Sequence, residues 1–102
     1  MKQIFIDKFL VPQNAQQEFI ERMNINRNFI KDFPGFIEDV AYERTDEQEN
    51  LVYITIATWE NEESLKNAKG LVQAEYQKQG FNMSAMLERL EIKMERGIYK
   101  KI

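Results

Sequence analysis

The chain of 102 residues contains neither cysteine nor histidine. Without cysteine it has no disulfide, no thiolate nucleophile and no thiolate metal ligand. Without histidine it lacks the usual general base near neutral pH, the most frequent metal ligand and the proximal ligand of most haem proteins. No loop has the spacing of acids and glycine that binds Ca²⁺, so we expect no metal site. Any chemistry must come from Asp, Glu, Tyr, Lys, Arg, Asn and Trp, or from a bound substrate.

Proline, glycine and long apolar runs are also scarce. Two prolines and four glycines leave little room for a linker, and 102 residues fit a single domain. No apolar run approaches the ~20 residues that span a bilayer, and the first residues, MKQIFIDKFL, have no signal-peptide pattern. The net charge of −3 offers no broad attraction to nucleic acid or anionic lipid. We therefore expect a cytoplasmic protein without a nucleic-acid or membrane partner.

Apolar periodicity predicts secondary-structure elements in the order β-α-β-β-α-β. Strands are expected over residues 3–11, 36–44, 51–59 and 91–101. Helices are expected from Asn14 to about Asp32 with a break over 24–28, from Asn61 to Gly80, and over a short piece, 81–89. This order is typical of the α+β, ferredoxin-like fold, in which both helices cover one face of a four-stranded antiparallel sheet. Its first and third strands are central, and these are the two strands that are apolar on both faces.

The segment 51–59, LVYITIATW, needs a cover on both faces of the sheet. The helices cover only one face, so the other face would expose Ile4, Ile6, Leu10 and one alternating set from 51–59. Such a patch exceeds the few hundred Å² or so that monomers usually expose. A second copy would cover it by sheet-to-sheet packing, which gives a homodimer built as an α+β barrel. The alternative is a monomer in which long Lys and Arg stems screen the face.

Four short motifs are spread along nearly the whole chain. They are FLVP at 9–12, EF at 18–19, FPGF at 33–36 and ATWEN at 57–61. In these motifs the chain resembles the antibiotic biosynthesis monooxygenase family, and residues 1–102 would form one such domain. The resemblance implies a dimeric α+β barrel with a ligand cavity between helices and sheet in each subunit. It also implies oxidation of a small aromatic or quinol-like substrate without a metal or flavin cofactor.

The chain departs from the residues on which one branch of that family depends. That branch degrades haem with an Asn on the first strand and a Trp and a His on the second helix. Those positions fall on Asp7, Ala68 and about Lys78, so none is retained and haem degradation is not expected. Other members carry a His near the position of Asn67. Two readings stay open: a cofactor-independent monooxygenase, and a non-catalytic dimeric small-molecule-binding or scaffold domain of the same fold.

Asp7 is the candidate catalytic residue. It lies between Phe5 and Phe9 on one face of a central strand, where apolar neighbours would favour its protonated form and make it a possible base. The structural alternative is a salt bridge or hydrogen bond to a Lys, Arg or Tyr of a neighbouring strand.

Three candidate substrate-binding residues lie on the segment 51–59. Trp59 ends the strand and either contacts a ligand or packs a helix onto the sheet. Tyr53 and Thr55 share its face and would place hydroxyls in a cavity if that face is the helix side. They would be interface residues if it is the dimer side, and periodicity does not decide between the two.

Three more candidates lie on the expected helices. Asn26 falls on an apolar stripe, where it either lines a cavity or bonds the backbone at a helix break. Phe81 and Met83 belong to a soft apolar cluster that either walls a pocket or is plain core.

Overall fold

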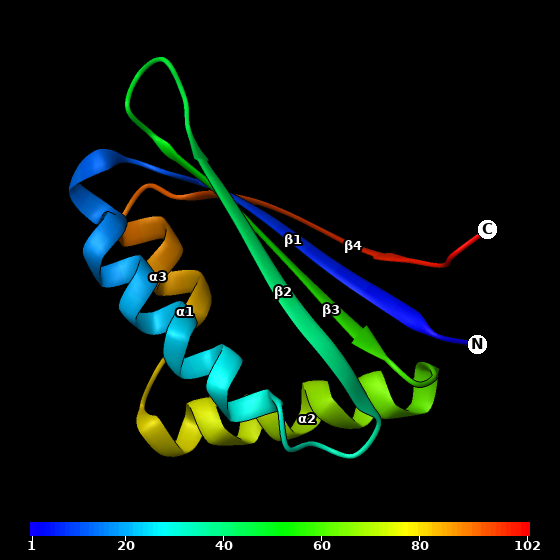
Figure 1. Cartoon of the computed structure of the whole chain (residues 1–102). Coiled ribbons are helices and arrows are strands. Elements are labelled where there is room, and N and C mark those ends of the chain that lie inside the picture. Colours follow the sequence, from blue (N-terminus) through cyan, green and yellow to red (C-terminus); the bar gives the residue numbers. More distant parts are fainter.

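The computed structural model describes residues 1–102, and it confirms the α+β, ferredoxin-like fold (Figure 1). Its elements, in chain order, are β1 (Gln3–Val11), a short 3-10 helix η1 (Gln13–Ala15), α1 (Gln16–Ile30), β2 (Phe36–Thr45), β3 (Leu51–Trp59), α2 (Glu62–Gln79), α3 (Met83–Arg89) and β4 (Lys93–Tyr99). Figure 1 shows the helices gathered on one side of the sheet, with the two chain ends close together.

The four strands form one antiparallel sheet in the order β2-β3-β1-β4. The central position of β1 and β3 is as expected. Asp7 pairs with Thr55 of β3 on one side and with Arg96 of β4 on the other. Because directly paired residues place their side chains on the same face, this register puts a carboxylate beside a guanidinium under the helices.

Two expectations for the first helix are wrong. Asn14 does not cap it, since it lies within η1 and no side chain caps the start of α1. The expected break over 24–28 is also absent, because α1 runs without interruption from Gln16 to Ile30. Asparagine costs roughly 0.7 kcal/mol per residue in a helix, whereas burial of Phe19 and Met23 against the sheet contributes more. Tertiary packing therefore overrides local propensity here.

The boundaries of the second helix are confirmed. The Asn61 side chain accepts a hydrogen bond from the Ser64 backbone N–H at 2.8 Å, which satisfies one of the unpaired donors of the first turn. Gly80 ends the helix in the left-handed conformation at φ 66°. Asn82 then caps α3 by accepting from the Ala85 N–H at 2.9 Å, so this helix begins two residues later than expected.

The Pro34–Gly35 turn brings the chain against the start of α2. Gly35 has a φ of +80°, and a Cβ added there would meet the Ser64 hydroxyl at 2.1 Å. Its carbonyl also accepts a hydrogen bond from the Glu60 N–H at 2.8 Å. Only glycine satisfies both the backbone conformation and the close approach, which explains the FPGF motif physically.

Two separate groups of buried side chains lie between the sheet and the helices. We call the larger one the first core cluster; it comprises Phe9, Val11, Ala15, Phe19, Met23, Leu51, Tyr53, Met86, Leu87 and Ile92. We call the smaller one the second core cluster; it comprises Ala57, Trp59, Leu65 and Ala68. The rings of Phe9 and Phe19 are 4.9 Å apart edge to face, and those of Phe19 and Tyr53 are 5.2 Å apart. The first cluster is thus filled by aromatic rings, whereas half of the second consists of alanine.

The opposite face of the sheet has no helix over it. By the pairing register, its central side chains are the half-buried Ile4, Ile6, Leu10, Val40, Ile54 and Ile56, together with the buried Val52. Tyr42 and Tyr99 stand on the edge strands at 62% and 54% exposure. The ring of Tyr99 lies across Gly97, where an added Cβ would meet it at 2.9 Å. This face is largely apolar over both central strands, where the exposed Lys8, paired with Ile54, is the one charged side chain.

Candidate functional site

A cavity of about 660 Å³ lies between α2, the start of α3 and the sheet. We call it the α2 cavity. A second hollow, of about 420 Å³, lies between α1 and β2, but Phe36 is the only hydrophobic residue among the six that line it. Small-molecule sites are typically 300–1,000 Å³ and mostly apolar. The α2 cavity, with ten hydrophobic residues among sixteen, is therefore the candidate site.

Small side chains leave the room for this cavity. Ala57 of β3 and Ala68 of α2 are both buried, belong to the second core cluster and line the cavity. Larger rings then wall the space that the alanines leave open; these are Phe5, Trp59, Tyr76 and Phe81. The Trp59 ring is held by an edge-to-face contact with Phe36 at 5.5 Å. Flat aromatic walls suit a flat aromatic ligand.

The polar side chains of the cavity carry either no charge or a positive one. The neutral ones are Gln73, Gln77, Asn82, Ser84 and the Tyr76 hydroxyl, and the cationic ones are Lys69 and Arg96. No aspartate or glutamate lines it. Lys69 comes from α2 and Arg96 from β4, so the two cations are supplied by different elements.

Arg96 is held at the cavity by Asp7. Its Nε donates to Asp7 Oδ1 at 2.7 Å and its Nη2 to Asp7 Oδ2 at 2.9 Å. Hydrogen bonding to the Asp7 carboxylate raises the pKa of Arg96, and this outweighs the opposing effect of burial. Asp7 is 7% exposed and does not itself line the cavity. The cross-strand salt bridge that the sequence allows for Asp7 is thus present, and it engages both carboxylate oxygens.

Tyr76 is a half-buried ionisable group of the cavity wall. Burial raises the pKa of its hydroxyl above the ordinary value, and the negative charge of Asp7 adds to this. The positive charges of Arg22 and Arg96 and a hydrogen bond from Asn26 act in the opposite direction but do not cancel it. Tyr76 is therefore protonated at neutral pH, and its O–H serves as a hydrogen-bond donor rather than as a base.

The predicted substrate-binding residues divide into three groups. Trp59, Phe81 and Met83 line the α2 cavity. Asn26 does not line it but reaches the hydroxyl of Tyr76, which does. Tyr53 and Thr55 lie on the helix side of the sheet, which decides the question of face, but neither lines the cavity.

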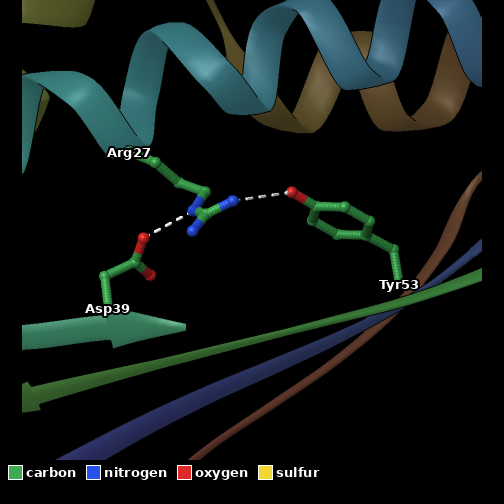
Figure 2. A network of polar contacts seen from close by, with 3 residues as sticks. All are labelled: Arg27, Asp39 and Tyr53. Carbon is green, nitrogen blue, oxygen red and sulfur yellow. Dashed lines mark hydrogen bonds and ion pairs between the residues drawn. The ribbon is translucent and has the colours of Figure 1, made fainter. Parts of the chain in front are cut away.

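Tyr53 belongs instead to a polar network beside the first core cluster (Figure 2). Arg27 of α1 donates from Nε to Asp39 Oδ2 at 2.5 Å, and from Nη1 to the Tyr53 hydroxyl at 3.4 Å. Burial opposes the charge of Arg27, but these hydrogen bonds outweigh it and raise the pKa of the guanidinium. The network ties α1 to β2 and β3, and it engages the Tyr53 hydroxyl.

Lys69 and Arg96 are the cavity residues that sequence reasoning missed. A signal for each is nevertheless present in the sequence. Arg96 shares a strand face with the apolar Met94 and Ile98, so it is a charge on an otherwise apolar face. Lys69 follows Ala68 on the α2 stripe that packs on the sheet. What the sequence could not supply was the register that sets Arg96 opposite Asp7.

The side chains offer no obvious metal site and no membrane span. No three His, Cys, Asp or Glu side chains come together in a way that could hold a metal ion. None of the helices has the length and apolar character needed to cross a bilayer.

Comparisons with known proteins define the class by fold. No protein-family model and no curated protein matches the chain. Among solved structures, the cofactor-independent oxygenase SnoaB from Streptomyces nogalater matches with a TM-score of 0.73 and 23% identity, over 99% of this chain and 93% of that one. A protein from Deinococcus radiodurans, provisionally assigned as an antibiotic biosynthesis monooxygenase, matches with a TM-score of 0.71 and 11% identity, over 97% and 91%.

A third solved structure bears on assembly. A dimeric ferredoxin-like protein from an uncultured marine organism matches with a TM-score of 0.72 and 10% identity, over 96% of this chain and 92% of that one. The structural neighbours thus include antibiotic biosynthesis monooxygenase-like proteins, the family that the sequence motifs resemble. At these identities the similarity shows a shared fold.

Proposed function

We propose that the α2 cavity binds a small aromatic or quinol-like molecule and that the protein oxygenates it without metal or flavin. The observation that carries this proposal is the cavity itself, which is walled by Phe5, Trp59 and Phe81 and faced by two cations. The shared fold with a protein described as a cofactor-independent oxygenase supports the reaction type.

The reaction balances without an added reductant, because the substrate supplies the electrons. A deprotonated phenol passes one electron to O₂, and the resulting radical and superoxide combine at the carbon para to the hydroxyl. The peroxide anion formed there takes up a proton equivalent to the one that the phenol released to solvent. Loss of the hydrogen on that carbon with cleavage of the O–O bond then gives a carbonyl and one water. Each turnover consumes one O₂, places one oxygen atom in the product and releases the other as water.

The side chains of the cavity have distinct roles in this scheme. Lys69 and Arg96 stabilise the phenolate and so favour loss of the substrate proton. The Tyr76 hydroxyl donates to the oxygen on which negative charge develops. The aromatic walls exclude water from the radical pair. Asp7 is the carboxylate nearest this chemistry, and its engagement with Arg96 favours a positioning role over that of the proton acceptor.

Oxygen consumption tests the proposal directly. The protein is mixed with a panel of small phenols and quinols in the presence of a chelator, and O₂ uptake is followed with an electrode. We expect uptake of one O₂ per substrate with at least one compound, and incorporation of a single ¹⁸O atom from ¹⁸O₂. If compounds of the panel bind tightly but none causes O₂ uptake, the result would instead favour the non-catalytic binding domain. The salt bridge between Asp7 and Arg96 is also consistent with that alternative.

We also propose that a second copy of the chain covers the helix-free face of the sheet. The apolar side chains over β1 and β3 support this, as does the dimeric state named for one structural neighbour. Sedimentation should give twice the chain mass at micromolar concentration. The variant Ile54→Lys, which places a charge at the centre of that face, should shift the protein to the monomer. Sedimentation of the wild-type protein as a monomer would contradict the proposed homodimer.

A further inference from the structure

The two cations of the α2 cavity converge on one aromatic ring. Lys69 Nζ lies 5.4 Å from the centroid of the Phe5 ring, and Arg96 Cζ lies 4.9 Å from the same centroid. Phe5 is itself part of the cavity wall. A ligand that packs beside Phe5 would therefore lie near both cations.

One of these positive charges has no compensating partner. Asp7 neutralises Arg96 through Nε and Nη2, which leaves Nη1 without a hydrogen-bond partner. Lys69 takes part in no salt bridge, and no carboxylate lines the cavity. Among the residues that line the cavity, Lys69 thus carries the one uncompensated positive charge, in a chain whose net charge is −3. Arg22, which also takes part in no salt bridge, is not a lining residue but stacks on Phe81 and Tyr76. Because the protein as a whole repels anions weakly, the charge of Lys69 is a local feature of the cavity.

The apolar walls and the polar groups of the α2 cavity together indicate the size and the charge of its ligand. Trp59 and Phe81 offer flat apolar surface, and about 660 Å³ gives room for a molecule of two fused rings. The half-buried, protonated Tyr76 adds a hydrogen-bond donor to the lining. The lining has two cations and no carboxylate, so its only side-chain acceptors are amide and hydroxyl oxygens.

We propose that the α2 cavity selects an aromatic carboxylate, whose ring packs against Phe5 and Trp59 and whose anionic group lies between Lys69 Nζ and the free edge of Arg96. One negative charge on the ligand matches the one uncompensated cation. This inference rests on the proposed function in one respect, since it takes the same cavity as the ligand site. It adds the charge that the substrate carries.

Calorimetric titration with a matched pair of ligands tests the proposal. The probes are 2-naphthoate and 2-naphthamide, which share their rings and differ in charge. We expect the carboxylate to bind the wild-type protein about tenfold more tightly at low salt, with most of this preference lost at about 0.5 M NaCl because salt screens exposed charges.

Variants of α2 then locate the charge that is responsible. Lys69→Met keeps an apolar stem and removes the charge, so it should weaken 2-naphthoate about five- to tenfold and leave 2-naphthamide unchanged. Lys69→Arg should retain the preference. Lys66→Met is the matched control, because Lys66 is exposed on the same helix and does not line the cavity; it should bind both probes as the wild type does.

Equal affinity of the wild type for the two probes would overturn the proposal, as would a Lys69→Met variant that weakens both equally. Because 2-naphthoate has no phenolic hydroxyl, its binding is independent of oxygen chemistry. If the protein binds 2-naphthoate selectively but consumes no O₂ with any phenol, the carboxylate selectivity is supported and the oxygenase activity is rejected. If Lys69→Met does not fold, the salt dependence of the wild type and the Lys69→Arg variant still decide the question.

Discussion

The two core clusters occupy the same face of the same sheet, yet one is filled and the other is hollow. On β3 the first cluster has Tyr53 where the second has Ala57, four residues further along the same face. On the helices the first cluster has Phe19 of α1, and the second has Ala68 of α2. Side-chain volume at a few facing positions thus separates a core from a cavity, with no change in backbone topology.

The filled end should carry most of the stability. Phe19→Ala removes a fully buried ring that contacts both Phe9 and Tyr53, and we expect a loss of about 3–5 kcal/mol in the free energy of unfolding, measured in urea. Leu71→Ala is the control, since Leu71 is 42% exposed and surface changes stay within about 0.5 kcal/mol. A loss below about 1 kcal/mol for Phe19→Ala would show that the first core cluster does not dominate folding.

Asp7→Asn tests whether Asp7 stabilises the α2 cavity through its salt bridge with Arg96 or acts as a catalytic base. We expect a loss of about 1–2 kcal/mol, kept low because the Arg96 side chain is 47% exposed. Binding of 2-naphthoate should be retained, since Arg96 keeps its charge. Measurement of unfolding and of O₂ uptake on one preparation separates the roles. Full stability with abolished uptake would make Asp7 the proton acceptor after all.

Ala68→Met should fill part of the α2 cavity and so make the second core cluster resemble the first. The flexible thioether can extend into the α2 cavity, so ligand binding should weaken at least about tenfold, or about 1.4 kcal/mol, while the free energy of unfolding changes by less than about 1 kcal/mol. Calorimetry with 2-naphthoate and urea unfolding give the two numbers. Unchanged binding would show that ligands do not use this cavity.

Asn61→Ala loosens the start of the helix that roofs the cavity. Loss of the hydrogen bond to the Ser64 N–H should cost about 1 kcal/mol of stability. Asn67→Ala is the matched control within α2, because it removes an exposed asparagine that makes no capping bond. That control should be neutral or slightly stabilising, since alanine is the better helix former. Equal losses in both variants would argue against the cap.

Tyr76→Phe should show the smallest effect, and only at high pH. Burial raises the pKa of Tyr76 in the folded protein above its ordinary value of 10.0. The unfolded chain therefore loses this proton first, so wild-type stability is unaffected below that value and falls as the pH rises through it. The variant lacks this contribution, and the stability difference between the two proteins should shift in its favour above pH 10. Urea unfolding at neutral and alkaline pH checks the sign.

The central strands could be predicted from the sequence because a strand buried on both faces has apolar residues at consecutive positions. The order of the elements and the apolar residues on both strand faces predict residues 3–11 and 51–59 at the centre of the sheet, and both lie there. The break expected over 24–28 failed for the opposite reason. Helix propensity is a local quantity, and the burial of Phe19 and Met23 against distant strands outweighs it.

The candidate site could be predicted only in part. Trp59, Phe81 and Met83 were found because each is a large side chain on an apolar stripe. The cavity itself depends on Ala57 and Ala68 coming together although 10 residues separate them in the sequence, and small residues give no signal of their own. Arg96 became interpretable only once the register set it opposite Asp7.

Trp59 is the only tryptophan of the chain, it is 2% exposed, and it stands in the wall of the α2 cavity. All indole fluorescence of the protein therefore arises at the candidate site. Emission should be blue-shifted and resistant to quenching by iodide, and a naphthalene-containing guest should accept its excitation energy. The molecule carries its own optical reporter, so occupancy can be followed in unlabelled protein at concentrations far below those that calorimetry needs.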